Sequence, residues 1–216
     1  MKHDIAFYEE EHTYLVDGNE TPSVTTILSY LTDTEYGKVN PSVLEQAAKR
    51  GSLVHEYTEA IDYDCDPDEV EFEVAGYLKA YKQFIKDYKP LWRYVEQPVY
   101  SEMFDFVGTV DREGLINYRE SVVDIKTIAA PTKLQKFVVS SQTEAYAIAI
   151  RETYGIRVEK RYALYLGKDG DYNLVDLDEY DEKYDYNSFA VFDACHKFYN
   201  QVQGIKAMKP IRKGKK

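Results

Sequence analysis

The chain has 216 residues, 44% of them hydrophobic, and a formal net charge of −11. This length suits one domain with a core of its own, and this composition excludes a disordered chain. The acidic balance argues against a DNA-binding function, because DNA-binding proteins gain affinity by neutralising phosphates.

The first 90 residues are predicted to form a strand pair and three helices. Residues 5–16 alternate loosely between apolar and polar side chains and end in a turn sequence at 17–19, so a strand, a turn and a short return are expected. Ser23 is a typical N-cap residue, Pro41 opens a helical pattern and Pro90 closes one. The three expected helices cover about residues 23–31, 41–62 and 70–88.

From residue 91 onward the sequence alternates strand patterns with long helical patterns. Gly155 is typical of the position after a helix C-terminus, and residues 168–171 form a good hairpin turn. The expected strands cover about residues 91–103, 107–116, 121–127, 158–166 and 172–177. The expected helices cover about residues 131–154 and 182–203.

This order predicts an α/β fold with a central mixed β-sheet flanked by helices and a helical N-terminal cap. One domain would cover residues 1–205, with the strand pair and helical cap in 1–90 and the core in 91–205. Residues 206–216 carry six basic residues and no acid, and would form a basic tail. Such a tail is either an electrostatic tether for nucleic acid or a solvated terminus, and the second interpretation is favoured.

The two cysteines and the apolar runs indicate the compartment. Cys65 and Cys195 lie far apart and form no Cys-x-x-Cys motif, so they imply neither a disulfide framework nor a zinc site. No signal peptide is visible, and no apolar run approaches the ~20 residues of a membrane span. We therefore expect a soluble, cytoplasmic protein with no membrane partner.

Asp124 and Lys126 lie two residues apart on the predicted strand 121–127, so their side chains point to the same face. Val123 and Ile125 point to the opposite, apolar face. Taken alone, such a pair is a surface salt bridge most of the time. Charged side chains seldom extend an apolar strand, however, unless their face opens on a cleft.

Asp111 lies on the preceding strand, at the end of a Gly-x-x-Asp sequence that begins at Gly108. If the two strands pair as a hairpin, Asp111 and Asp124 converge, and two carboxylates so close repel each other unless a cation lies between them. Mg2+ prefers oxygen ligands, which Asp111, Asp124 and the carbonyl of Ile125 can supply. Lys126 would then orient the attacking water, lower its pKa or offset charge on the phosphate.

Three further positions have both a functional and a structural interpretation. Gly51 and His55 share a helix face. Gly51 lets another backbone approach, and His55 can ligate a metal or contact a phosphate. A lone helical histidine is, however, more often a packed or solvated residue. Gln142 and Tyr146 share a face of a later helix, where a polar pair on an amphipathic helix is the favoured interpretation. Glu96 is either a further acidic neighbour of the site or a solvent-facing carboxylate on an edge strand.

Four short motifs in this order resemble those of the RecB-like PD-(D/E)xK nucleases. They are Gly-x-x-x-His at 51–55, Gly-x-x-Asp at 108–111, Asp-Ile-Lys-Thr at 124–127 and Gln-x-x-x-Tyr at 142–146. The opening at 12–25 is similar to the leader of small phage-type and bacterial members, and the core is similar to that of exonucleases of the mitochondrial genome maintenance type. The resemblance covers roughly residues 10–165 and implies a restriction-endonuclease-like core.

The resemblance also implies the role of each motif. The catalytic and metal-binding roles, with Mg2+ or Mn2+ as the cofactor, fall on His55, Asp111, Asp124, Ile125 and Lys126. The substrate-binding roles fall on Gln142, Tyr146 and Ser52. Glu96 would be an additional acid. Some relatives hold an iron–sulfur cluster with four cysteines, and the two cysteines of this chain exclude that cofactor.

We therefore expect a Mg2+- or Mn2+-dependent deoxyribonuclease. It would be an exonuclease acting on single-stranded or duplex DNA ends, in phage or bacterial recombination, repair or processing, with a replication or recombination protein as a partner. The alternatives are a structure-specific endonuclease of the same fold and a catalytically inactive DNA-binding module; the intact set of Asp111, Asp124 and Lys126 argues against the inactive module. Because the chain is acidic, DNA binding would depend on a local basic groove. The candidates for that groove, with the tail, are Lys133, Lys136, Arg151, Arg157, Lys160 and Arg161.

Overall fold

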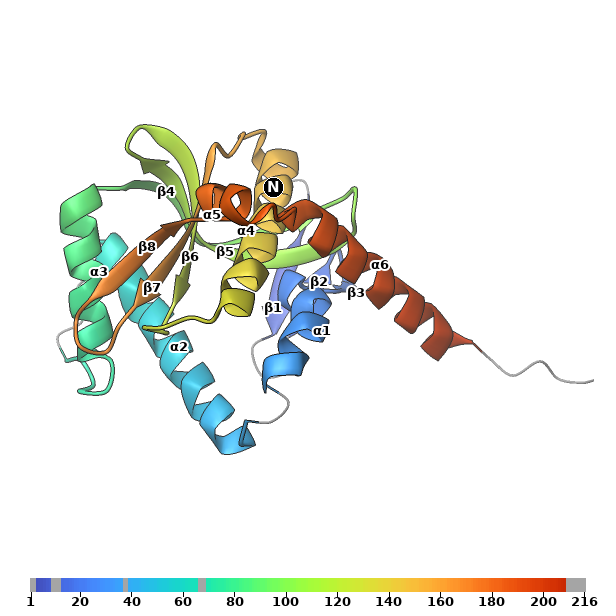
Figure 1. Ribbon diagram of the computed structural model, residues 1–216. Coiled ribbons are helices and arrows are strands. Elements are labelled where there is room, and N and C mark those ends of the chain that lie inside the picture. The colour runs from blue at the N-terminus through green and yellow to red at the C-terminus, as the bar shows by residue number, and fades with distance from the viewer. Residues whose placement is uncertain (1–2, 9–12, 37–38, 66–68, 209–216) are drawn as a thin grey trace, which may run out of the picture.

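The computed structural model describes residues 3–8, 13–36, 39–65 and 69–208. His12 of the resembling leader and residues 209–216 of the expected basic tail lie outside the described residues. Within the described part, the chain forms a small sheet, a large sheet and six helices (Figure 1). None of the helices in that part is both long and apolar enough to cross a membrane.

The small sheet is antiparallel and lies at the N-terminus. Its strands, in order, are β1 (Ile5–Tyr8), β2 (Thr13–Val16) and β3 (Asn19–Thr21). Asp17 and Gly18 make the predicted turn with positive φ angles of 50° and 81°. Tyr14 of this sheet forms a buried cluster with Val107 of the large sheet, and its hydroxyl lies 2.8 Å from Oγ1 of Thr109. The small sheet is therefore fastened to the strand that leads to Asp111.

The large sheet has five strands. In sheet order they are β4 (Leu91–Ser101), β5 (Phe106–Ile116), β6 (Arg119–Lys126), β7 (Lys160–Leu166) and β8 (Tyr172–Asp176). Only β6 and β7 pair in parallel, and the other neighbours pair antiparallel. A parallel pair needs a crossover, which α4 (Lys133–Tyr154) supplies. The predicted α/β fold with a mixed sheet flanked by helices is confirmed.

Helices cover both faces of the large sheet (Figure 1). The other five helices are α1 (Val24–Tyr36), α2 (Pro41–Asp62), α3 (Ala75–Tyr88), α5 (Leu177–Tyr184) and α6 (Ser188–Ala207). Helices α1, α4 and α6 share one core with Val122 of β6. Helices α2 and α3 share the other core with Val123 and Ile125 of the same strand. The N-terminal helices thus lie on both faces of the sheet and not in a single cap.

Helix boundaries differ from the prediction at several places. Helix α1 continues to Tyr36, and α3 begins at Ala75. The single last helix expected over 182–203 is wrong, because the structure has two helices there. Asp185 ends α5 in a left-handed conformation with φ 51°, and the side chain of Asn187 accepts a hydrogen bond from the amide of Ala190 to begin α6.

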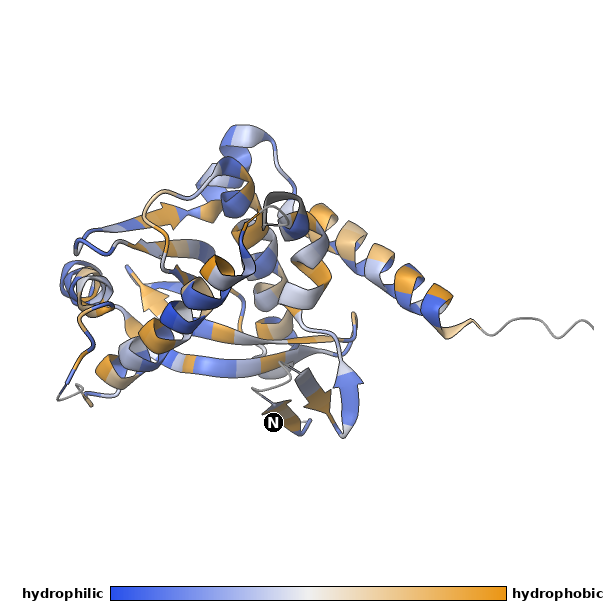
Figure 2. Cartoon of the chain, turned by 90° about the horizontal axis from the view of Figure 1, so that it is seen from below, coloured by the Kyte–Doolittle hydropathy of each residue, from blue (hydrophilic) through white to orange (hydrophobic). Residues whose placement is uncertain are grey.

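The C-terminal part of α6 extends away from the rest of the molecule (Figures 1 and 2). Phe198 and Ile205 are 53% and 62% exposed there. The buried residues of this helix lie in its first half and include Phe192 and Cys195. The first half therefore holds the helix against the sheet.

Candidate metal centre and active site

Asp124 and Lys126 occupy the end of β6, next to the crossover helix. Nζ of Lys126 lies 2.7 Å from Oδ2 of Asp124, and the Asp124 side chain is 1% exposed. Val123 and Ile125 face the opposite core, beneath α2 and α3. The predicted division of this strand into a charged face and an apolar face is confirmed.

Asp111 lies where β5 and β6 separate. Their paired register ends at Arg112 and Val123, so Asp111 and Asp124 are the next opposed positions, beyond the last pair. Oδ2 of Asp111 accepts a hydrogen bond of 2.6 Å from the amide of Ile125, which the backbone of β5 leaves unpaired. The carboxylate therefore replaces a backbone acceptor and holds the two strand ends together.

Charge and burial together perturb the pKa of Asp111. Burial raises this pKa, the positive charges of His55 and Lys126 lower it, and the negative charges of Asp124 and Glu96 raise it; the net effect is upward. The buried acids at this point therefore repel one another, as expected for carboxylates arranged around a cation.

His55 reaches the same place from α2. Its Nδ1 lies 3.0 Å from Oε1 of Glu96 and 3.8 Å from Oδ1 of Asp111. Burial alone lowers the pKa of His55, but the charge of Asp111 and the hydrogen bond and charge of Glu96 outweigh it, and the pKa rises to about 9. The metal-free protein thus holds His55 as a cation between two acids.

Glu96 is held in the site by an unusual backbone and by a buried arginine. Its φ of 45° is left-handed although it lies inside β4, a conformation that costs about 1–3 kcal/mol and recurs at functional sites as well as at turns. Nη1 of Arg112 donates to Oε1 of Glu96 at 2.8 Å, and Nη2 donates to Oγ1 of Thr58 at 2.9 Å. Glu96 is therefore not a solvent-facing edge carboxylate.

Arg112 was not among the residues singled out in the sequence. Its side chain has no exposed surface, and it also pairs with Asp62 and donates to the carbonyl oxygen of Asp111 at 2.6 Å. The signal available in the sequence was a run of three charged residues, Asp111 to Glu113, between apolar residues of one strand. A charge in that place requires buried partners, which the sequence could not identify.

The ligand atoms of His55, Glu96 and Asp111 lie within 4.8 Å of one another and can hold a metal ion. This group differs from the metal-binding set expected from the sequence: Glu96 belongs to it, and Asp124 lies beside it without being a member. Ile125 takes part through its amide, which donates to Asp111. Its expected role as a carbonyl ligand stays a prediction.

Asp124 supplies an independent reason to place a cation here. Neither of its oxygens accepts a hydrogen bond from any residue that the structure describes, although the carboxylate is buried. A buried carboxylate with only an ion pair to a half-buried lysine is costly. A donor set of carboxylates and one imidazole fits a divalent cation.

Gln142 and Tyr146 of α4 also lie at the site. Nε2 of Gln142 donates to the Tyr146 hydroxyl at 3.0 Å, and both side chains are buried. Burial, followed by the charges of Asp124 and Asp111, raises the pKa of Tyr146 well above its usual value. A Cβ added at Gly108 would lie 2.7 Å from Cε1 of Tyr146, so the glycine of the Gly-x-x-Asp motif makes room for this ring.

Other sequence expectations have different outcomes. Ser52 is exposed on α2, and its substrate-binding role stays a prediction. Among the residues that the structure describes, a Cβ at Gly51 would meet only Oγ1 of Thr127, at 4.0 Å; no backbone of these residues approaches the glycine closely, and that expectation is wrong.

Two candidates for a basic DNA groove are engaged in structural pairs. Arg161 is buried and pairs with Asp178 and Asp181 at 2.7 and 2.9 Å. Lys160 pairs with Asp176 at 2.6 Å. The expectation that these two side chains form a free basic groove is therefore wrong.

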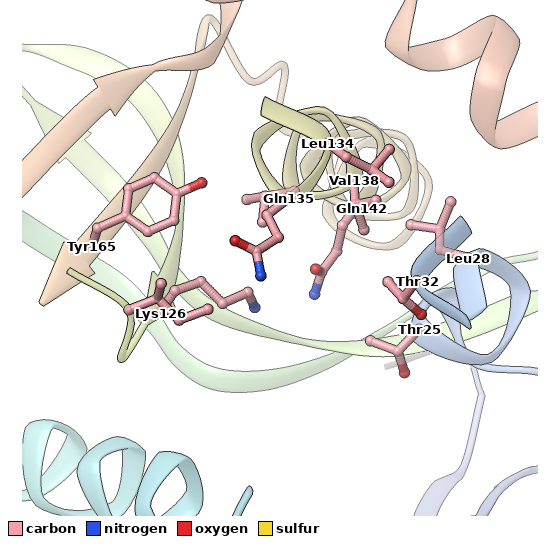
Figure 3. Close-up of a pocket in the computed structure, with 11 residues that line it drawn as sticks. Thr25, Leu28, Thr32, Lys126, Leu134, Gln135, Val138, Gln142 and Tyr165 are labelled. Carbon is pink, nitrogen blue, oxygen red and sulfur yellow. The ribbon is translucent and has the colours of Figure 1, made fainter. Parts of the chain in front are cut away.

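A cavity of about 230 Å³ adjoins the site on the side of α1. Lys126 and Gln142 line it, together with Leu28 of α1 and Leu134 and Val138 of α4 (Figure 3). The cavity therefore shares two side chains with the candidate active site.

No protein-family model matches this chain, and no curated protein matches it.

Proposed function

We propose that this chain is a divalent-cation-dependent deoxyribonuclease with a restriction-endonuclease-like core, of the RecB-like PD-(D/E)xK type. The observation that carries the proposal is the convergence of His55, Glu96 and Asp111 beside the pair of Asp124 and Lys126. This is a metal-binding set next to a buried acid and a lysine, which is the arrangement that phosphodiester hydrolysis needs.

The side chains have distinct roles in this proposal. A bound Mg2+ or Mn2+ would supply Lewis-acid activation of water and of the phosphodiester. Hydrolysis forms a bond from the water oxygen to phosphorus and breaks the bond from phosphorus to the leaving sugar oxygen. Lys126 offsets the negative charge that develops on the phosphate, while Asp124 fixes the lysine ammonium group at 2.7 Å.

Other residues position this machinery. Arg112 holds Glu96 in place through Nη1, and the amide of Ile125 holds Asp111. Gln142 and Tyr146 form a hydrogen-bonded wall at the same acids and bind the substrate. The reaction would serve DNA recombination, repair or processing, and the enzyme would act as an exonuclease on DNA ends.

Digestion of end-labelled single-stranded and duplex DNA tests the proposal. Wild-type protein is expected to degrade the DNA with Mn2+ or Mg2+ and to be inert with EDTA. Lys126→Ala and Asp124→Asn should lower the rate by about a hundredfold or more, the scale of loss for a group that stabilises transition-state charge. Lys197→Ala is the matched control, because Lys197 forms a surface ion pair with Asp193 on α6.

Each outcome separates the alternatives. Equal inactivity of wild type and Lys126→Ala on both DNA forms with both metals would refute the nuclease proposal. Cleavage of covalently closed circular DNA would identify an endonuclease instead of an exonuclease. Calorimetric binding of Mn2+ distinguishes a metal site from an inactive DNA-binding module, in which no metal binding is expected.

A further inference from the structure

The cavity beside Lys126 is unlike the rest of the molecule in charge. The chain carries a net charge of −11, yet none of the eleven described residues that line the cavity is acidic, and Lys126 is charged. A negatively charged ligand that enters this space meets no carboxylate in the lining itself, and Asp124 lies next to it, 2.7 Å from the Lys126 ammonium group.

The walls of the cavity suit a flat apolar group with a polar edge. Leu28 of α1 lies beside Leu134 and Val138 of α4, so the aliphatic side chains form one wall, away from Lys126 and Tyr165 (Figure 3). The amides of Gln135 and Gln142 and the Lys126 ammonium group point toward one another in the same space (Figure 3). Pockets of this kind, apolar with a few convergent polar groups, are typical ligand sites.

Two of these polar groups are fixed before any ligand arrives. Oε1 of Gln135 accepts a hydrogen bond of 2.8 Å from the amide of Thr132, in the capping box that begins α4. Nε2 of Gln142 donates to Tyr146 at 3.0 Å. Their orientation is therefore set by the start and the middle of α4, and little conformational entropy is lost on binding.

We propose that this cavity receives one unpaired nucleobase of the DNA strand being cut. The inference rests on the proposed nuclease function and adds the form of the substrate to it. A phosphate contacted by Lys126 carries its own sugar and base, and the cavity opens directly beside that lysine. The base lies against the aliphatic wall, and its edge meets the two amides, as bases outside a duplex do in other pockets.

The size of the cavity excludes a base pair. Pockets for drug-sized ligands are about 300–1,000 Å³, and this cavity of about 230 Å³ holds a smaller group. A base that enters it must leave its partner strand. The preferred substrate is thus a single strand or an end that has opened.

Two matched DNA strands test this inference with Mn2+ present. One is an ordinary single strand, and the other has the same length but stable abasic residues in place of its nucleotides. The wild-type protein should cut the abasic strand about tenfold more slowly or worse, which lies within the range that stacking of one base contributes. The Mn2+ dissociation constant, measured by calorimetry, should be the same with either strand present.

Substitutions that fill the cavity give the second arm. Val138→Phe and Thr32→Trp reduce the space from two different helices, since Thr32 lines it from α1. Both should cut the ordinary strand about tenfold more slowly and the abasic strand at the wild-type rate. Val43→Trp is the control, because Val43 is 52% exposed on α2. Thermal unfolding and Mn2+ binding verify that each variant is folded. If Val138→Phe does not fold, Thr32→Trp still tests the inference, because Thr32 is only half-buried.

The outcomes distinguish a failure of the base pocket from a failure of the proposed nuclease function. If the wild type cuts both strands equally fast, the base pocket is refuted while the nuclease proposal stands. If it cuts neither strand, both proposals fall. If the two cavity variants retain the full preference for the ordinary strand, the base is recognised elsewhere and the pocket is again refuted.

Discussion

At the scale of single residues, the candidate site is a set of like charges held together by positively charged neighbours. Glu96, Asp111 and Asp124 converge in a buried space, and Arg112 and Lys126 offset part of their charge. The left-handed backbone of Glu96 adds to the cost of this arrangement. Such a cost is expected where side chains are arranged for a ligand and not for the stability of the free protein.

The charge state of His55 leads to a pH prediction. The pKa of about 9 means that His55 is protonated at pH 7 in the metal-free protein. A metal ligand must be a neutral imidazole, so a bound cation displaces that proton, and its affinity increases as pH rises toward 9. We expect the Mn2+ dissociation constant to fall about tenfold between pH 7 and pH 8 in calorimetric titrations. Equal affinity at the two pH values would contradict this, and His55→Gln should weaken the pH dependence.

Gly108 leads to a stability prediction. In Gly108→Ala the new Cβ would lie 2.7 Å from Cε1 of Tyr146, so the ring must shift. We expect the free energy of unfolding in urea to fall by about 1–3 kcal/mol, as in other overpacked cores, with a loss of cleavage rate. Gly204→Ala is the matched control, because nothing lies within 4 Å of its added Cβ in α6. It should raise stability by about 0.5–1 kcal/mol; a Gly108→Ala protein as stable as wild type would refute the steric argument.

At the scale of secondary structure, the site depends on where elements end. Strands β5 and β6 separate just before Asp111, and β6 ends at Lys126, from which the chain leads into α4. Helix α2 crosses nearby and contributes His55, while the left-handed residue of β4 contributes Glu96. Four elements therefore meet at one place, and each brings a side chain that would otherwise be solvated.

Arg161 stabilises the elements behind the site. It pairs with Asp178 and Asp181 of α5, and donates to the carbonyl of Ser140 in α4 at 3.0 Å and to Oγ of Ser188 in α6 at 3.0 Å. We expect Arg161→Gln to lower the free energy of unfolding by about 3–5 kcal/mol, because it leaves the buried carboxylate of Asp181 without its partner.

The DNA affinity of folded Arg161→Gln should equal that of wild type when both are measured by fluorescence anisotropy below the unfolding transition. Arg157→Gln is the control at an exposed arginine on the same approach to β7, with a stability change within about 0.5 kcal/mol. If the Arg161→Gln protein is stable but fails to bind DNA, Arg161 belongs to the DNA-binding groove after all.

At the scale of the whole molecule, charge is the main obstacle to binding DNA. The chain carries −11, and in the proposed nuclease the phosphate would approach the acids of the site. A bound divalent cation is the largest local charge in such a site and reverses its sign. Metal and DNA should therefore bind cooperatively.

This cooperativity is open to measurement with a labelled single strand. Replacing EDTA with Ca2+, which carries the same charge as Mg2+, should tighten DNA binding by about tenfold or more, equivalent to about 1.4 kcal/mol. Fluorescence anisotropy measures the two dissociation constants. Asp124→Asn should lose most of the difference, and a wild-type affinity that is the same with and without Ca2+ would show that the phosphate does not meet the cation.

The sequence by itself determined the elements and half of the site. Alternation along 121–127 assigned Asp124 and Lys126 to one face and the two apolar residues to the other, because side chains in a strand alternate. The same local patterns predicted the five strands and the crossover helix. They missed the break between α5 and α6, because an aspartate in a left-handed conformation leaves no periodic pattern.

Only the tertiary structure decided which groups meet. Glu96 joined His55 and Asp111 through a backbone conformation that no propensity predicts, and Arg112 found its partners on α2 and β4. Arg161, expected in a DNA groove, instead became part of the interior. The cavity beside Lys126 forms where α1, α4 and the ends of β6 and β7 meet. Distances between residues far apart in the chain depend on packing, which local sequence patterns do not contain.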